Sequence, residues 1–363
     1  MMKKLSLRTF GIITLLFQLL LFRFLCSRTQ WIETVFVPKV FYPLSSVFRW
    51  VTSWFPFSVG LVFIYFLCGL LIVLLIRNVR KVINGSLPFK DALLSLAAWG
   101  SLVFLFYAVT WGLLYYRQPV SVLLRYDTAP ATVEELRSLC EDLVNRTNHA
   151  RSRLTDSAIY KISPESLVEK APKAYSATRL PFLKYATPSI KMATGSSLLA
   201  YMGTSGIYTF WSGEANINRV NTNVDLPAVT LHEMAHQVGF ASEDEANYIA
   251  WRVGKDYPDP LFQYSSAYNV VWRSLRRLWN VDSTYAQTLY SRLDSAVYRD
   301  AKIENARWDP YRNPGQKYVI SPFYNLFLKA NGREYGIMSY DRVVDLIIYE
   351  RRGSDSVFVG KMN

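Results

Sequence analysis

The stretch PAVTLHEMAHQVGFASEDEAN, residues 227–247, contains the spacing His-Glu-x-x-His at positions 232–236. Residues four positions apart lie on the same face of an α-helix, with Cβ atoms about 5–6 Å apart. On such a helix, His232 and His236 can bind one metal ion through their imidazole nitrogens. Because Pro227 opens this stretch and Gly239 directly follows the apolar Val238, we predict a helix over 227–238.

Glu233 follows the first of these histidines, one position further round the helix. This offset places its carboxylate beside a bound metal rather than on it, which suits a general base acting on a metal-bound water. The chain contains 3 histidines in all, and chance placement gives this motif in on the order of one in a thousand such chains. We therefore predict a zinc site with His232 and His236 as ligands and Glu233 as the catalytic residue. The remaining histidine, His149, is expected on a solvated helix face.

The third metal ligand has to come from outside this motif. Zinc enzymes with the pattern HExxHxxGxxH carry a histidine where this chain has Ser242. Ser242 and Glu245 have the spacing of a capping box, so we predict that a second helix begins here and doubles back toward the first. Glu243 is favoured as the third ligand over Glu245, which the cap would occupy, and over Asp244. Asn247 is expected to hydrogen-bond the free ring nitrogen of a ligand histidine.

Three apolar runs precede the motif, at about residues 10–26, 57–76 and 93–116. Each approaches the roughly 20 residues that a helix needs to cross a bilayer. A cleavable signal peptide is the alternative for the first run, but no small-x-small cleavage site follows it. We predict a membrane domain over 1–116 with three transmembrane helices, followed by a second domain over 117–363.

Charge is distributed unevenly along the chain. Residues up to Tyr116 include 11 Lys and Arg but 2 Asp and Glu, whereas the remainder is close to balance. No basic stripe interleaved with aromatic residues follows, so the net charge of +13 indicates a membrane partner and not nucleic acid. Basic residues cluster before the first apolar run and directly after the second. By the positive-inside rule, the N-terminus is expected in the cytoplasm and residues 117–363 outside the cytoplasmic membrane.

The second domain is predicted to be mainly helical with a small β-sheet, an α+β fold. Helices are expected at 132–154 and 163–175, capped by Thr132 and Ser163, and at 227–238, 243–253, 261–279, 284–300, 321–330 and 340–351. Glycine-bounded, β-branched and aromatic residues between Ser196 and Asn218 predict strands and a turn. The segment GIYTFW (206–211) is expected to be either an edge strand to which a peptide adds or a core strand. Cys140 is the only cysteine of this domain, so no disulfide within it and no cysteine-based zinc site is expected.

The motif HEMAH followed by EDEAN (243–247) resembles the gluzincin metallopeptidases, which take their third ligand from a Glu-x-x-x-Asp helix. The chain departs from that pattern in a very short gap between the two elements and in Asn247, where aspartate is usual. More closely, the chain resembles a family of bacterial membrane proteins of unknown function with a zinc-peptidase-like domain. The matching stretches are FPFSVG (55–60), YMGTSGIYTFWSGEANIN (201–218), HEMAHQVGFASEDEAN (232–247) and FLKANGREYGIMSYDRVVDL (327–346). This resemblance implies a membrane-anchored hydrolase with a zincin-like domain, without implying a substrate.

The expected function is zinc-dependent hydrolysis of peptide bonds, with one Zn²⁺ and with a peptide or protein as substrate. Tyr340 is a candidate donor to the developing oxyanion. One alternative is a zinc hydrolase that acts on a non-peptide amide, such as a cell-wall component, because the chemistry at the carbonyl is the same. The other is a non-catalytic receptor or scaffold stabilised by zinc, although structural zinc sites usually have four ligands rich in cysteine.

Overall fold

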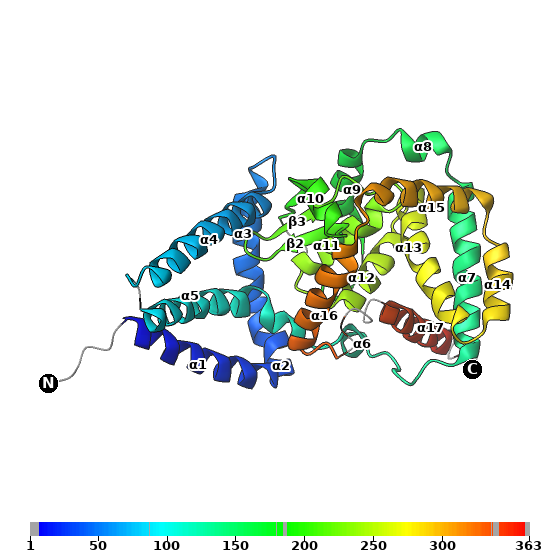
Figure 1. The fold of residues 1–363 in the computed structure, drawn as a ribbon. Coiled ribbons are helices and arrows are strands. Elements are labelled where there is room, and N and C mark those ends of the chain that lie inside the picture. The colour runs from blue at the N-terminus through cyan, green and yellow to red at the C-terminus, as the bar shows by residue number, and fades with distance from the viewer. Residues whose placement is uncertain are drawn as a thin grey trace.

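A computed structural model describes residues 7–86, 88–178, 180–183, 187–334, 336 and 341–359. Three long helices, α1 (Leu7–Cys26), α4 (Val59–Ile83) and α5 (Phe89–Thr110), project from one end of a helical body (Figure 1). They coincide with the three apolar runs. The C-terminal end of the chain lies on the far side of that body (Figure 1).

Among the described residues, one helix, α4, has the length and hydropathy needed to cross a membrane. The stretches Ile13–Cys26 and Leu96–Thr110 form shorter apolar helices. One candidate span is therefore established, and the crossing by all three helices stays a prediction. The predicted third span over 93–116 is too long, because its last residues leave the helix. Gly112–Tyr116 form a 3-10 helix, η2, whose leucines are buried against protein.

The segment between the first two apolar runs is helical. It consists of α2 (Thr29–Trp31), the π-helical η1 (Ile32–Phe41) and α3 (Tyr42–Ser53). Apolar residues of η1 and η2 pack against three residues from the body and form what we call the membrane-side cluster: Ile32, Phe36, Val37, Phe41, Trp111, Leu113, Leu114, Tyr115, Tyr208, Ala241 and Leu328. The N-terminal segment is thus joined to the body by a continuous apolar core.

The body is mainly helical, as predicted, and most of its apolar side chains form one large core. Its longer helices are α7 (Val133–Ser152), α9 (Pro164–Ala177), α11 (Leu226–Gln237), α12 (Glu243–Asp256), α13 (Pro260–Trp279), α14 (Ser283–Ser291), α15 (Ser295–Trp308), α16 (Ser321–Ala330) and α17 (Val343–Val359). Its short helices are α6 (Val120–Leu123), α8 (Asp156–Tyr160), η3 (Asp309–Tyr311) and η4 (Gln316–Ile320). The expected caps Thr132 and Ser163 are confirmed.

One predicted helix is wrong in its extent. The helix expected over 284–300 is two helices, because the carboxylate of Asp294 accepts a hydrogen bond from the Ala296 amide (2.8 Å) and starts α15 there. Capping side chains compete with the continuation of a helix in this way.

The expected small sheet is present, has three strands and lies beside α11; its first strand precedes the stretch 196–218 in which strands were expected. Its order is β1-β3-β2, with β1 (Ile190–Met192) parallel and β2 (Gly206–Thr209) antiparallel to the central β3 (Glu214–Ile217). The segment that precedes β2 was expected to be strand and is partly helical, as α10 (Ser196–Tyr201). Since β2 pairs on one side only, it is an edge strand of this sheet.

Candidate metal centre

The two histidines lie on α11, which is buried throughout except at His232. Leu231, Met234 and Ala235 pack into the large core and fix the helix. The helix ends where Gly239 adopts a left-handed conformation with φ of 85°. The Phe240 amide then bonds to the Ala235 carbonyl (3.1 Å), which reverses the chain. This turn brings the next helix back over the middle of α11.

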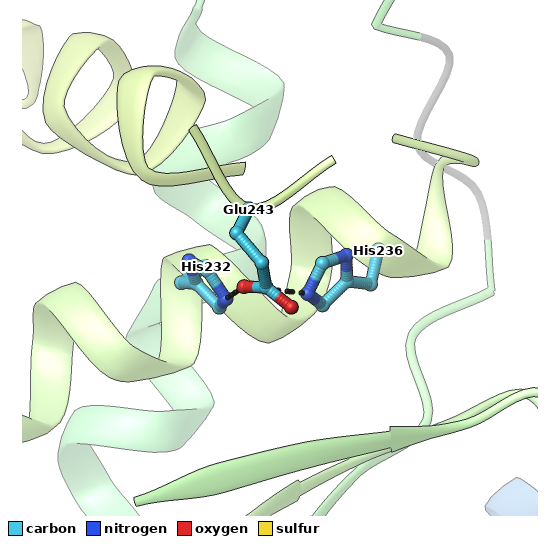
Figure 2. Close-up of side chains that lie close together, drawn as sticks. All are labelled: His232, His236 and Glu243. Carbon is cyan, nitrogen blue, oxygen red and sulfur yellow. Dashed lines mark ion pairs between the residues drawn. The ribbon is translucent and has the colours of Figure 1, made fainter. Parts of the chain in front are cut away.

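Glu243 is the first residue of α12, and its side chain reaches between the two histidines (Figure 2). Its Oε2 lies 3.1 Å from Nε2 of His232 and 3.7 Å from Nε2 of His236. One ligand atom from each of the three residues lies within 4.8 Å of the others. Donors that share a tetrahedral zinc at about 2.0–2.2 Å are about 3.3–3.6 Å apart, so the three side chains fit a single ion.

The ring of His236 is fixed by its other nitrogen, Nδ1, which lies 2.6 Å from the Phe240 carbonyl oxygen. This contact makes Nδ1 an N–H donor, so Nε2 is the nitrogen that would bind a metal, with loss of the proton it shares with Glu243. His232 has no equivalent. Its Nδ1 and the side-chain nitrogen of Asn247 are both buried without a hydrogen-bond partner among the described residues. The expected bond from Asn247 to a ligand histidine is therefore not formed.

Burial and mutual contact set the charges in the cluster. Burial lowers the pKa of His232. Burial also lowers that of His236, but the contact with Glu243 outweighs it and raises the pKa to about 9. For Glu243, burial favours the neutral acid, yet the two histidines hold its pKa well below the ordinary value. Glu243 is thus an anion facing two imidazoles, a donor set of two nitrogens and one oxygen that suits catalytic zinc.

Tyr324, from a distant part of the chain, hydrogen-bonds to the Glu243 carboxylate. Its hydroxyl on α16 donates a hydrogen bond to Oε1 of Glu243 (2.6 Å), the oxygen other than the Oε2 that pairs with the two histidines. Such a donor fixes a ligand carboxylate in orientation. Sequence reasoning missed this residue, because Tyr324 is one of 24 tyrosines and belongs to no motif.

Glu233 is buried beside the cluster and is not part of it, as its place in the motif predicts. Its Oε2 has no hydrogen-bond partner among the described residues. Burial, aided by the charge of Glu243, raises its pKa to about 8 despite the opposing effect of His236. A Cβ on Gly206 would meet the Glu233 carboxylate at 2.5 Å. The start of β2 thus passes directly against this carboxylate.

The other acidic residues of EDEAN point elsewhere. Oε1 of Glu245 accepts a hydrogen bond from the Val120 amide (2.8 Å). The predicted capping box is wrong, since the hydroxyl of Ser242, although at the N-cap position, donates to the Asp244 carboxylate. Oriented toward Asp244, the hydroxyl oxygen accepts no hydrogen bond from a backbone amide of α12. His149 is exposed, as expected, and Tyr340 lies outside the described residues.

Two buried arginines close the far end of α11. Nη1 of Arg49, from α3, donates to the Gln237 carbonyl (3.1 Å), and Nη1 of Arg117 donates to the Val238 carbonyl (3.0 Å). Arg117 is also paired with Glu33 of η1 at 2.8 Å. Cations at a helix C-terminus satisfy the last carbonyls and oppose the helix dipole. The segment up to Arg117 thus positions α11, the helix that carries the histidines. No sequence motif indicated this role.

Comparison with known proteins gives the family and no activity. A family model described as a protein of unknown function, DUF3810, matches residues 36–348. The chain belongs to this family. The matched residues include α3, α4 and α5 together with His232, His236 and Glu243. No curated protein and no solved structure matches the chain.

Proposed function

We propose that this member of the DUF3810 family is a membrane-anchored zinc metallopeptidase. One observation carries the proposal: Nε2 of His232, Nε2 of His236 and a carboxylate oxygen of Glu243 converge within 4.8 Å, next to a buried carboxylate that coordinates nothing. His232, His236 and Glu243 would hold the ion. A zinc ion bound there makes its water acidic and polarises a substrate carbonyl.

Glu233 has the position of a proton carrier in this reaction. Its Oε2 is buried and without a partner among the described residues, so it is available to a water or a leaving group in the site. We propose that its ionised form, which the positive charge of a bound ion would favour, takes a proton from the attacking water and later delivers it to the leaving amine. Tyr324 keeps the Glu243 carboxylate in place meanwhile and takes no part in the proton transfer.

Peptide bonds are favoured as the substrate over other amides by the position of β2. This edge strand pairs with β3 on one side only and passes against Glu233 at Gly206. An extended peptide that adds to the free side of such a strand gains main-chain hydrogen bonds along its length. Its carbonyls would then run past the Glu233 carboxylate.

A catalytic role also explains the donor set better than a structural role does. Structural zinc sites are closed by four protein ligands, usually including cysteine, whereas catalytic sites keep a position for water. Within the described residues, the cluster comprises three ligands. A scaffold would gain nothing from burying Glu233 with Oε2 unpaired among the described residues, because burial of a polar atom without a hydrogen bond destabilises the fold.

We further propose that α1, α4 and α5 all cross the cytoplasmic membrane. The basic residues at the N-terminus, at the end of α4 and at the start of α5 would remain in the cytoplasm, which places residues 117–363 outside. The ends of α1 and α5 that adjoin the body would then lie at the outer surface.

The test uses full-length protein purified in detergent, its zinc content and its action on a peptide library. Glu233→Gln preserves shape and hydrogen-bonding capacity but cannot accept a proton. We expect one zinc per chain in both proteins, and a loss of turnover by at least about 100-fold in the variant. Undiminished turnover by Glu233→Gln would remove this residue from the mechanism, and wild-type protein without bound zinc would end the proposal.

A further inference from the structure

The helix α3 is amphipathic, but its polar side is buried and its apolar side is exposed. Its buried residues are polar: Ser45, Arg49 and Thr52. Most of its exposed residues are apolar and include Trp50, which is 52% exposed; Trp54, directly after the helix, is 71% exposed. A helix on the surface of a protein in water buries its apolar side. An apolar side turned outward therefore indicates surroundings other than water.

Buried hydrogen bonds fix this orientation. Arg49 donates to the Gln237 carbonyl at the end of α11, as described above. The Thr52 hydroxyl lies 2.9 Å from that of Ser189 and 3.2 Å from the Ser212 carbonyl oxygen. Rotation of α3 about its axis would leave these buried polar groups unpaired, which destabilises the fold. The tryptophans of α3 consequently cannot turn inward.

A second exposed apolar surface lies on η4 and α16. The residues that form it are Tyr318, Val319, Phe323 and Leu326. Phe323 and Leu326 are 74% and 66% exposed. On the other side of α16, Tyr324 bonds to Glu243 and Leu328 belongs to the membrane-side cluster. The inner side thus contacts Glu243 and the membrane-side cluster, and the outer side is largely exposed.

These two surfaces lie at the same level, at the end of α5. The ring of Phe48 on α3 is 6.4 Å from that of Phe106, and the ring of Phe327 on α16 is 6.2 Å from that of Tyr107. Phe106 and Tyr107 occupy the last turn of α5. Figure 1 shows α3 and α16 running across the direction of α1 and α5. Helices placed in this way lie parallel to the surface of a bilayer that α5 enters.

The metal centre adjoins this level. Trp111 follows the last residue of α5, and its ring centroid is 5.5 Å from that of His236. Phe210, directly after β2, is 5.8 Å from Tyr107. Both His236 and β2 thus lie close to the C-terminal end of α5.

We propose that the outer sides of α3 and of η4–α16 lie in the headgroup region of the lipid bilayer, and that the metal centre cleaves juxtamembrane segments of membrane-anchored proteins. Tryptophan and tyrosine are favoured at that depth, and amphipathic helices bind there by burying their apolar side. The surfaces continue the exposed apolar surface of α4 and α5, which favours lipid over a second copy of the chain. The assignment of a substrate rests on the proposed peptidase function.

Photo-crosslinking tests the position in the membrane without depending on activity. Full-length protein is reconstituted into vesicles of phosphatidylethanolamine and phosphatidylglycerol, with p-benzoylphenylalanine in place of one exposed aromatic residue at a time. Trp54 and Phe323 are the test positions, Phe66 on α4 is the lipid-facing control, and Tyr298 on α15 is the water-facing control; all are exposed aromatic residues. We expect lipid adducts at Trp54 and Phe323 at yields near that of Phe66, and none at Tyr298. Yields at the test positions as low as at Tyr298, or adducts to a second chain, would overturn the proposal.

Cleavage then tests the substrate class. A segment of randomised sequence is placed directly after a membrane anchor, or at the end of a long flexible linker on the same anchor, in the same vesicles. We expect faster cleavage of the near segment by about tenfold or more, and loss of that preference in Trp54→Ser/Phe323→Ser. Equal cleavage of near and far segments by the wild type would overturn the assignment. Lipid adducts without cleavage of either segment would instead refute the peptidase function and leave the membrane position standing.

Discussion

The helices α3 and α11 have the same length, 12 residues each, and distribute their side chains in opposite ways. Every residue of α11 except His232 is buried, so protein surrounds it and holds a polar cluster in its midst. On α3 only three polar residues are buried, and its tryptophans face outward. One hydrogen bond, from Arg49 to Gln237, joins the two helices.

This contrast teaches which changes act on chemistry and which act on location. The position of α11 depends on packing from all sides, so substitutions near it should alter metal binding or stability. The position of α3 depends on protein on one side and on its surroundings on the other. Substitutions on its outer side should therefore leave the fold intact and change where the molecule resides.

The largest effect is expected at Glu243, the contact of α12 with both histidines of α11. Glu243→Ala removes one of three ligands and should weaken zinc binding by more than about 100-fold, because even residues behind a ligand contribute 10–100-fold. Glu245→Gln is the matched control two residues away, since this carboxylate bonds to the Val120 amide instead. Competition with a zinc chelator measures both. Weaker zinc binding in Glu245→Gln than in Glu243→Ala would show that the third ligand is misassigned.

A smaller loss is expected where α3 and α11 meet. Arg49→Met keeps much of the side-chain volume but leaves the Gln237 carbonyl without this donor, which should destabilise the fold by about 1–3 kcal/mol. Trp50→Ser, the next residue on the same helix, removes an exposed side chain and should change stability by less than about 0.5 kcal/mol. Thermal unfolding in detergent compares the two. Equal effects would mean that the two sides of α3 are not distinct.

Tyr324→Phe should act on the metal centre and not on the fold. The hydroxyl is lost while the ring stays packed against the membrane-side cluster, so zinc affinity is expected to fall by about tenfold with an unchanged melting temperature. Phe323→Tyr, which adds a hydroxyl on the outer side of α16, serves as the control and should leave zinc affinity as it is. A Tyr324→Phe protein with wild-type zinc affinity would exclude a role in holding Glu243.

The smallest effect concerns a contact between α7 and α17, which involves neither α3 nor α11. Hydrogen bonds from Arg352 and from the Thr132 amide lower the pKa of Glu135 to about 2. Because the pKa is lowered on folding, ionised Glu135 stabilises the fold at pH values above its unfolded pKa of about 4.5. This contribution disappears as the pH falls toward about 2. Glu135→Gln should lower stability at neutral pH by less than about 1 kcal/mol. The difference from wild type, followed by thermal unfolding, should shrink on acidification. A gap that widens would contradict this account of Glu135.

Local patterns in the sequence predicted the helices α7, α9, α11, α12, α13 and α16, since periodicity, caps and glycines act over a few residues. The same locality explains why Glu243 was the favoured ligand: a glycine turn and a helix start fix the return of the chain within seven residues of His236. The capping box at Ser242 failed although its spacing was right, because Glu245 found a partner, Val120, that lies 125 positions away.

The surroundings of the site were beyond the reach of such patterns. Arg49, Arg117, Trp111 and Tyr324 all contact α11 or Glu243 across more than 80 positions of sequence. None belongs to a motif, and an arginine or tryptophan near an apolar run reads equally well as a membrane-interface residue. Burial decides their role, and burial follows only from the assembled tertiary structure.

X-ray absorption at the zinc edge of the full-length protein tests the central claim most directly. The account predicts one zinc per chain in a four-coordinate site of nitrogen and oxygen donors at about 2.0–2.1 Å, with two imidazoles, and the loss of this site in Glu243→Ala. Protein that retains no zinc after purification and dialysis, or a spectrum unchanged by Glu243→Ala, would contradict it.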